Sequence, residues 1–541
     1  MDAYSMSVTN ATLKNTSKIY QDLKISRIPS LDRSPRGLSI MDRVLKQETL
    51  DPGRKPHIGV VGAGLAGLRS ADLLLRHGFR VTILEARNRL GGRMCQNRLS
   101  NGHLVDMGPN WIHGTVDNPI MDLAKETETA VGSWDNRSYV FDEDGELFSL
   151  EDGTKYSTIV WNIIEDAFEY SNKQGSDIDS DKSLLDFFRE QVTIKIPETE
   201  DGYAKKRHVV LQLSELWGAF VGSPIDKQSL KFFWLEECID GETENLFCAG
   251  TYQKILERIA QPAVDGADIR YSTRVSEIHG KSTAASDTVK VKTVDGNIFE
   301  FDEIVLTTPL GWLKRNLQAF KPPLPDRMSK AIQSIGYGCL EKVYISFPKA
   351  FWLTPSEDSR TVQGFCQWLS PKYAPDSNPE GWTNEIVELA SLDDPSISHP
   401  TLLFYIYGAE SQHVTSKIRS LSGKNERDEF LFAFFKPYYS RLPSYREDGP
   451  ECQPSGCIST DWLHDDLAGN GSYSNFQVGL EEGDKDVRAM RAGVPDEGIW
   501  LAGEHTAPFV ALGTVTGAYW SGEDIAKRIA QSYGWLGRVD N

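Results

Sequence analysis

The pattern of apolar and polar positions becomes regular after residue 54. Residues His57–Val61 form a short apolar run, and residues 79–84 form a second one. Apolar residues recur between the two runs at helical spacing, namely Leu65, Leu68, Ala71, Leu74 and Leu75. The pattern predicts a strand, a helix and a strand within about thirty residues, which is a βαβ unit.

The rest of the chain is less regular. Helices are predicted over residues 183–192, 209–221 and 516–532. Strands are predicted on both sides of a turn at Asp295 and Gly296, and over residues 341–347. Loops rich in Pro, Ser and Asp are predicted over residues 354–380 and 391–400. Residues 1–54, rich in Ser, Thr, Lys and Asp, are predicted to be a poorly ordered leader.

Length and charge limit the function classes. At 541 residues the chain is long enough for about two to four domains. Its net charge of −19 argues against nucleic-acid binding, which needs clustered lysine and arginine. An acidic field could steer a cationic substrate, although acidity is also ordinary in a soluble protein.

Cysteine usage and hydropathy point to an intracellular protein. The seven cysteines show neither a CxxC pair nor zinc-ligand spacing, so no metal site and a reduced chain are expected. No window reaches the roughly 18 apolar residues that a membrane span needs, and no targeting signal is evident. We therefore expect a cytoplasmic protein without a membrane partner, and the sequence indicates no oligomeric state.

The strongest local signal is the run Gly62-Ala63-Gly64-Leu65-Ala66-Gly67, which follows the first strand and opens the helix. In such a turn the first glycine permits the tight bend, and the second lets a pyrophosphate approach the backbone. The third glycine allows close helix–strand packing, and Glu85 is placed to accept hydrogen bonds from a ribose diol. Gly62, Gly64, Gly67 and Glu85 therefore predict a site for NAD or FAD rather than NADP.

Two following segments resemble the flavin-containing amine oxidase family. Residues 85–93 match its ExRxRxGGR segment, and residues 106–114 resemble its DxGxxW segment, with an ending similar to polyamine and spermine oxidases in particular. The resemblance implies FAD contacts at Arg87, Gly92, Arg93 and Trp111. It also implies that His113 lies over the flavin and helps to place the substrate.

The resemblance continues in the middle of the chain. Residues 272–275 resemble a strand whose valine contacts adenine, which implies an FAD contact at Val275. Lys342 matches the family lysine that holds a water against flavin N5. A desolvated lysine near the flavin would have a lowered pKa and could aid reoxidation by O₂.

Two C-terminal segments extend the resemblance. Residues 471–474 resemble the segment that places an aromatic wall, here Tyr473, beside the flavin. Ser472 stands where monoamine oxidases carry the cysteine that bonds the cofactor, so FAD is expected to be non-covalent. Residues 503–506 resemble the motif whose carboxylate, here Glu504, meets the ribityl side.

The final helix opens with Thr514 and Val515, expected FAD neighbours whose helix dipole could stabilise negative charge on the reduced flavin. A plain helix cap is the alternative at Thr514. Monoamine oxidases carry a second aromatic where Thr514 stands, which argues against strict monoamine oxidase activity and leaves space for a bulkier or longer substrate.

Other features bear on the substrate. No long coiled-coil insertion or added helical module is evident, so a histone demethylase is not expected. An acidic cluster could attract a polyamine, although charge runs are usually solvated. Its members are Glu236, Glu237, Asp240 and Glu242.

The resemblance implies an α/β fold with two domains. A discontinuous Rossmann-like FAD-binding domain is expected over residues 55–130, 245–310 and 455–541. A substrate-binding domain with a mixed sheet and helices is expected over residues 131–244 and 311–454.

The function implied is that of an FAD-dependent amine oxidase, polyamine oxidase-like, with Lys342, His113 and Tyr473 as catalytic residues. Hydride would pass from the carbon beside a neutral amine to flavin N5. Water would hydrolyse the imine, and O₂ would reoxidise the flavin to give hydrogen peroxide. Two alternatives stay open: an oxidase or desaturase of an amino acid or specialised amine metabolite, and a flavin-fold binding protein without turnover.

Overall fold

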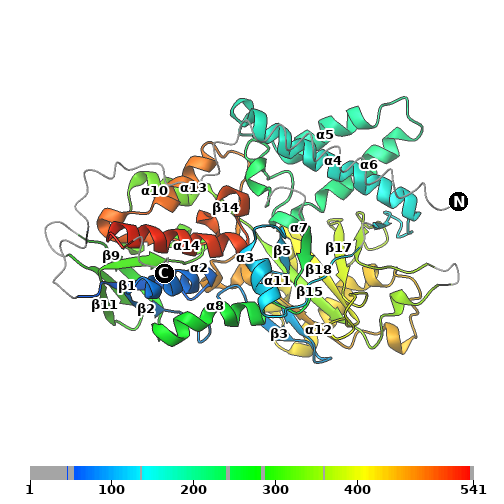
Figure 1. The fold of residues 1–541 in the computed structure, drawn as a ribbon. Coiled ribbons are helices and arrows are strands. Elements are labelled where there is room, and N and C mark those ends of the chain that lie inside the picture. The colour runs from blue at the N-terminus through cyan, green and yellow to red at the C-terminus, as the bar shows by residue number, and fades with distance from the viewer. Residues whose placement is uncertain are drawn as a thin grey trace.

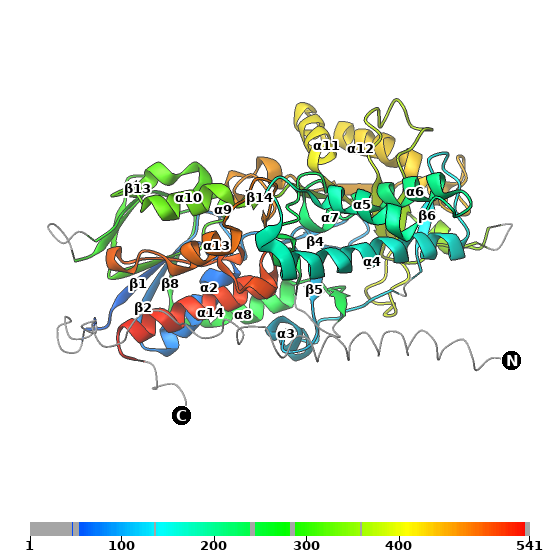
Figure 2. The same ribbon diagram turned by 90° about the horizontal axis from the view of Figure 1, so that it is seen from above.

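The computed structural model describes residues 46, 54–134, 137–238, 244–281, 287–356 and 360–535. Figures 1 and 2 show an elongated molecule with two lobes. One lobe contains β1, β2 and the helices α2, α8 and α14, and the other contains β15, β17 and β18 with the helices α4 to α6 beside them. No helix among these residues combines the length and apolar character that crossing a bilayer requires.

A five-stranded parallel sheet forms the centre of the first lobe, in the order β21-β12-β1-β2-β8. Its strands are β1 (His57–Val61), β2 (Arg80–Leu84), β8 (Asp268–Arg270), β12 (Glu303–Leu306) and β21 (Ile499–Leu501). The predicted βαβ unit is confirmed as β1, α2 (Leu65–Arg76) and β2.

Alternate residues of this sheet face two hydrophobic clusters. Val60 and Val305 pack with residues of α2, α8 (Gln253–Gly266) and α14 (Val515–Ser532). Their neighbours Val61 and Leu306 pack with a second sheet on the opposite face. Burial on both faces explains why these strands are continuous apolar runs.

The second sheet has four strands in the order β11-β10-β9-β13. They are β9 (Val275–His279), β10 (Val289–Thr293), β11 (Ile298–Phe301) and β13 (Phe320–Lys321). The predicted turn joins β10 to β11, where Gly296 has a φ of 88°. Three helices add residues to the same hydrophobic cluster: α9 (Leu310–Arg315), α10 (Asp326–Ser334) and α13 (Gly483–Ala492). Strand β13 of this sheet begins at Phe320. The sheet therefore extends past residue 310, where the sequence placed the end of the middle segment of the FAD-binding domain.

A six-stranded sheet forms the centre of the second lobe, in the order β19-β15-β18-β17-β16-β6. Its strands are β6 (Tyr139–Phe141), β15 (Leu340–Ser346), β16 (Phe365–Trp368), β17 (Asn384–Glu388), β18 (Thr401–Tyr407) and β19 (Gly456–Ser459). Helix α12 (Lys424–Tyr439) packs on one face, where α11 (Gly408–Ser420) also contributes side chains.

The loop predicted over residues 354–380 was wrong at β16. This short strand pairs with β17 and β6, and its alternate residues Cys366 and Trp368 are buried. Pairing on both sides stabilises a four-residue strand that turn-forming neighbours conceal in the sequence.

A helical layer covers part of the second lobe. It comprises α4 (Leu150–Gln174), α5 (Leu184–Lys195), α6 (Tyr203–Glu215) and α7 (Gly218–Val221). The helix predicted over residues 209–221 is divided into α6 and α7. Glycine begins α7 because a Cβ atom at Gly218 would lie 2.1 Å from the ring of Tyr407.

Candidate active site

The glycine turn between β1 and α2 leaves open space at one position. Gly62 has a φ of 104°, and a Cβ atom at Gly67 would lie 2.1 Å from the carbonyl oxygen of Gly62. A Cβ atom at Gly64 would meet nothing within 4 Å. Gly64 is the N-cap residue of α2, and no side chain caps the helix. The first amides of α2 therefore remain available to an anionic group such as a pyrophosphate.

Glu85 ties the end of β2 to this turn. One carboxylate oxygen accepts a hydrogen bond from the amide of Ala63 at 2.7 Å, and the other accepts one from the amide of Arg87 at 2.7 Å. The carboxylate is buried. Gly92 lies close by, because a Cβ atom there would be 3.4 Å from Cα of Gly64. Glu85 and Gly92, both predicted cofactor contacts, therefore lie beside the glycine turn.

Two arginines connect this region to the C-terminal part of the chain. Arg87 donates through Nη2 to both carboxylate oxygens of Asp465, at 2.9 and 2.8 Å. Arg93 donates through Nη1 to the carbonyl oxygen of Ser472 at 2.6 Å and to Glu504 at 3.1 Å. Arg93 therefore joins three segments that are distant in sequence.

Glu504 is buried between Arg93 and Ser474. The Ser474 hydroxyl donates to its carboxylate at 2.5 Å. Burial opposes ionisation of Glu504, but the Arg93 guanidinium and these hydrogen bonds hold its pKa below the usual value. Arg93 thus keeps a buried carboxylate ionised.

His505 beside it is a residue that sequence reasoning did not single out. It is 1% exposed, and neither ring nitrogen has a hydrogen-bond partner among the described residues. Burial lowers its pKa to about 4, so the ring is neutral at pH 7. Buried polar groups normally have partners, so an orphaned imidazole indicates a place where a ligand group fits.

Lys342 is buried on β15. Its Nζ donates to the carbonyl oxygen of Gly108 and lies 5.8 Å from the ring centroid of Tyr405. Burial lowers the pKa of Lys342, and the nearby carboxylate of Asp106 offsets only part of this effect. The Lys342 side chain is therefore desolvated.

A chain of hydrogen bonds surrounds Lys342. Trp111 Nε1 donates to the Tyr405 hydroxyl at 3.1 Å, which donates to Asn110 Oδ1 at 3.0 Å. Asn110 Nδ2 donates to the Tyr344 hydroxyl at 3.1 Å. Sequence reasoning missed Tyr344 and Tyr405. Lys342 and Tyr344 occupy alternate positions of one strand, which places them on the same face.

The indole of Trp111 faces an aromatic group. It stacks on Phe365 at 5.7 Å and meets Phe247 edge-on at 5.3 Å. Through Phe365 the indole packs against β16 of the second lobe, while the Trp111 carbonyl oxygen accepts a hydrogen bond from the Tyr252 hydroxyl at 2.7 Å.

His113 follows Trp111 on β5 (Trp111–His113), which pairs with β7 (Asn245–Phe247). Its Nδ1 lies 3.3 Å from Asn245 Oδ1. Burial lowers the pKa of His113, so a neutral imidazole predominates at pH 7. No hydrogen bond within the described part of the chain joins His113 to another predicted site residue.

Tyr473 lies beside the start of the last helix. Its hydroxyl donates to the carbonyl oxygen of Phe220 at 2.6 Å, and a Cβ atom at Gly513 would be 3.4 Å from its ring. Burial raises the pKa of the Tyr473 phenol, so it stays neutral. Ser472 accepts through Oγ from the amide of Leu340 at 3.2 Å.

Thr514 caps α14, because its Oγ1 accepts a hydrogen bond from the amide of Gly517 at 2.9 Å. Val515 is the first residue of that helix. Val275 opens β9 and is buried in the same cluster as Leu84. Val275 therefore packs in the core between the parallel sheet and the second sheet.

The acidic cluster divides in the structure. Asp240 and Glu242 lie outside the described residues. Glu236 ends the short helix Phe233–Glu236, and its Oε1 accepts a hydrogen bond from the amide of Phe476 at 3.0 Å. Glu236 is thus an inward-facing residue rather than part of a solvated charge run.

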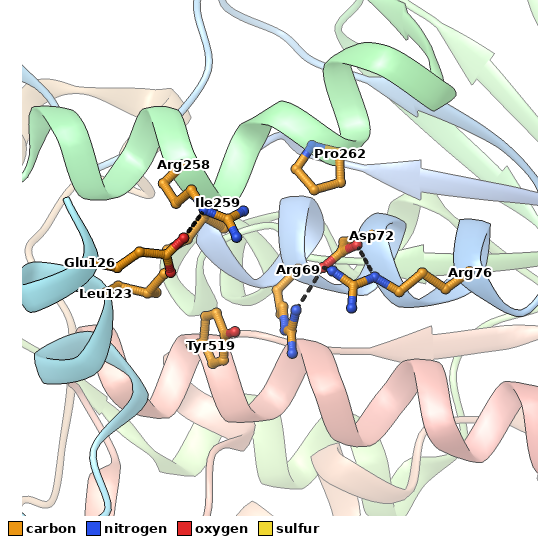
Figure 3. A pocket seen from close by; sticks show the side chains of 9 residues that line it. All are labelled: Arg69, Asp72, Arg76, Leu123, Glu126, Arg258, Ile259, Pro262 and Tyr519. Atoms are coloured by element: carbon orange, nitrogen blue, oxygen red, sulfur yellow. Dashed lines mark hydrogen bonds and ion pairs between the residues drawn. The ribbon is translucent and has the colours of Figure 1, made fainter. Parts of the chain in front are cut away.

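A cavity of about 220 Å³ elsewhere contains none of the predicted residues (Figure 3). It lies among α2, α8, α14 and α3 (Pro119–Glu126). Asp72 pairs with Arg69 at 2.6 Å and with Arg76 at 2.7 Å, and Arg258 pairs with Glu126 at 2.6 Å. The two Asp72 pairs lie within α2. Arg69 also pairs with Glu523 of α14, and the Arg258–Glu126 pair joins α8 to α3.

The chain is similar to several known proteins. Polyamine oxidase 4 of Oryza sativa subsp. japonica is 28% identical over 88% of this chain and 90% of its own length. Protein FLOWERING LOCUS D of Arabidopsis thaliana is 27% identical over 88% of this chain and 56% of its own length. Probable polyamine oxidase 4 of Arabidopsis thaliana is 32% identical over 59% of this chain and 63% of its own length. The chain thus spans less than two thirds of the length of the last two relatives.

A solved structure of a putrescine oxidase double mutant has the same fold. The TM-score is 0.64 at 18% identity, over 88% of this chain and 99% of that one. The expected α/β fold is therefore confirmed. The model of the flavin containing amine oxidoreductase family matches residues 65–530, and the chain belongs to that family.

Proposed function

We propose that the protein is an FAD-dependent amine oxidase with polyamine oxidase-like chemistry. The observation that carries the proposal is Lys342, a buried lysine with a lowered pKa that bonds to the segment leading to Trp111 and His113. Burying an ionisable group is unfavourable, so a buried lysine with a lowered pKa favours a functional role for Lys342.

The residues of the site fit FAD. The open space at Gly64 suits a pyrophosphate, and Glu85 lies beside that turn, where it could accept from a ribose. His505 offers two unsatisfied nitrogens beside Glu504. Ser472 carries no sulfur, so the attachment proposed is non-covalent.

The bound FAD would supply the hydride acceptor and pass the electrons to O₂, giving hydrogen peroxide. The chain's own residues would bind the cofactor, orient the amine and exclude water from the site. Tyr473 would form one wall for the amine, with its ring fixed through the Phe220 carbonyl. Helix α14, which Thr514 caps, would direct the positive N-terminal end of its dipole toward the cofactor.

The lysine would hold a water rather than contact the amine. Its Nζ donates one hydrogen bond to Gly108. A protonated Nζ keeps further donors for a water, and a neutral Nζ also has a lone pair. The neutral His113 could orient the substrate without adding charge.

Oxygen consumption in the presence of different amines tests the proposal. Spermine, spermidine, their acetylated forms, simple monoamines and free amino acids would be offered to the FAD-loaded protein, with peroxide measured by a coupled peroxidase. We expect polyamines or acetylpolyamines to give peroxide and simple monoamines to give little. Turnover of amino acids alone would replace the proposed substrate class, and turnover of none would indicate a binding protein.

A further inference from the structure

We infer that Glu236 accepts the proton that an ammonium substrate must lose before oxidation. The inference rests on the proposed function and adds a catalytic residue to it. An aliphatic amine has a pKa of roughly 10.4 and reaches the protein as an ammonium ion. Its nitrogen needs a free lone pair for the adjacent carbon to release hydride, so some group must take a proton.

The geometry of Glu236 suits this role. Oε1 is fixed by the amide of Phe476 at 3.0 Å, while Oε2 has no hydrogen-bond partner among the described residues. Glu236 is half-buried. Burial raises the pKa of the Tyr473 phenol, and the Glu236 carboxylate lies close enough to that phenol to add to the effect. Phe476 follows Tyr473 by three residues, which ties the carboxylate to the segment that carries the aromatic wall.

Packing holds the backbone around Glu236 in place. Trp234, two residues earlier, meets the ring of Phe509 edge-on at 5.5 Å. Leu235 is buried, and the carbonyl oxygen of Glu236 accepts a hydrogen bond from Cys238 at 3.6 Å. Because Oε1 is also fixed by the Phe476 amide, the carboxyl needs little reorganisation when a proton arrives.

Its surroundings favour the neutral form. Burial raises the pKa of Glu236 to about 8, and the carboxylate of Glu504 adds to this effect. The other titratable groups that face it are the neutral phenol of Tyr473 and the thiol of Cys238. No cation faces Glu236 in the described part of the chain, so the ammonium of an entering substrate would be the positive partner of its carboxylate.

The step is a simple proton transfer. An N–H bond of the ammonium breaks, an O–H bond forms on Oε2, and the electron pair stays on nitrogen. A carboxylate and an ammonium in a desolvated site are both expensive, whereas the neutral acid and the neutral amine are not. The transfer therefore leaves the amine in the form that oxidation requires.

The pH dependence of anaerobic flavin reduction tests the inference, with Glu236→Gln against the wild type. Glutamine keeps an acceptor for Phe476, so the fold should persist. For the wild type we expect kcat/KM to fall below about pH 8, the pKa of Glu236. For the variant the fall in kcat/KM should instead follow the pKa of the amine, which lies about two pH units higher. Scaled to the same plateau, its activity at pH 7 would be roughly 100-fold lower.

Glu410→Gln is the matched control. Glu410 is also buried with a pKa raised to about 8, but its carboxylate accepts from Asn384 at 2.9 Å in the second lobe. Its profile should match the wild type. Superimposable profiles for Glu236→Gln and the wild type would overturn the inference, while absence of reduction by any amine in all three proteins would instead refute the proposed function.

Calorimetry gives a second readout that does not depend on turnover. The ligand would be an amine whose α-carbon carries no hydrogen, measured at about pH 9 in buffers of different ionisation enthalpy. The wild type should bind it without net proton release, because the carboxylate keeps the proton. Glu236→Gln should release about one proton per amine bound. Equal proton release from both proteins would contradict the role of Glu236.

Discussion

Gly64 offers a substitution that separates cofactor binding from folding. Its φ of −74° and ψ of 177° suit any L-residue, and a Cβ atom there would touch no protein atom within 4 Å. Gly64→Val should therefore leave the apoprotein folded. Fewer unfolded conformations would even stabilise it by about 0.4–1 kcal/mol. The added side chain would occupy the space that a pyrophosphate needs, so FAD should be lost.

Gly67→Ala is the contrasting variant. Its Cβ atom would lie 2.1 Å from the Gly62 carbonyl oxygen and 3.0 Å from Thr307 Oγ1. Relieving this overlap requires the turn to move, at a cost of roughly 1–3 kcal/mol. We expect this variant to lower the unfolding temperature of the apoprotein, which Gly64→Val should not do.

Two measurements decide the comparison: the flavin-to-protein absorbance ratio after gel filtration, and thermal unfolding of the apoproteins. A Gly64→Val protein that retains wild-type flavin would refute the assignment of Gly64 to the pyrophosphate site. A large loss of stability in that variant would show that the open space at Gly64 was misjudged.

Three further predictions concern the same site. Lys342→Met should keep FAD bound while slowing flavin reduction or reoxidation by roughly 10²-fold, measured by stopped flow, and unchanged rates would remove Lys342 from the mechanism. Acid precipitation should release all flavin into the supernatant, because Ser472 cannot form a thioether; flavin in the pellet would contradict this. Arg93→Lys should weaken FAD retention at dialysis equilibrium, because the shorter lysine side chain would not reach Ser472 and Glu504, which Nη1 of the guanidinium now joins. Wild-type retention would show that this bridge is dispensable.

Local features of the fold could be predicted from the sequence. The strand, turn and helix around Gly62 follow from periodicity and glycine placement within a few residues. The cap at Thr514 and the turn at Gly296 are equally local. Each depends on neighbours close in sequence, which is why pattern alone finds them.

Contacts between distant segments could not be predicted in this way. Arg87 and Asp465 are 378 positions apart, yet they form one of the bridges that closes the site. The hydrogen bond that fixes the Glu236 carboxylate comes from Phe476, which is 240 positions away. Motif resemblance suggested that Arg93 and Glu504 contact the same cofactor, but only the fold shows that they pair with each other.

The central claim is that an amine reduces a flavin bound at this site. Anaerobic mixing of the FAD-loaded protein with a series of polyamines, acetylpolyamines, monoamines and amino acids tests it most directly, with the flavin absorbance followed over time. The account predicts that polyamine-type substrates bleach the flavin and that admitting O₂ restores its colour. A flavin that dithionite reduces but no amine bleaches would contradict the account.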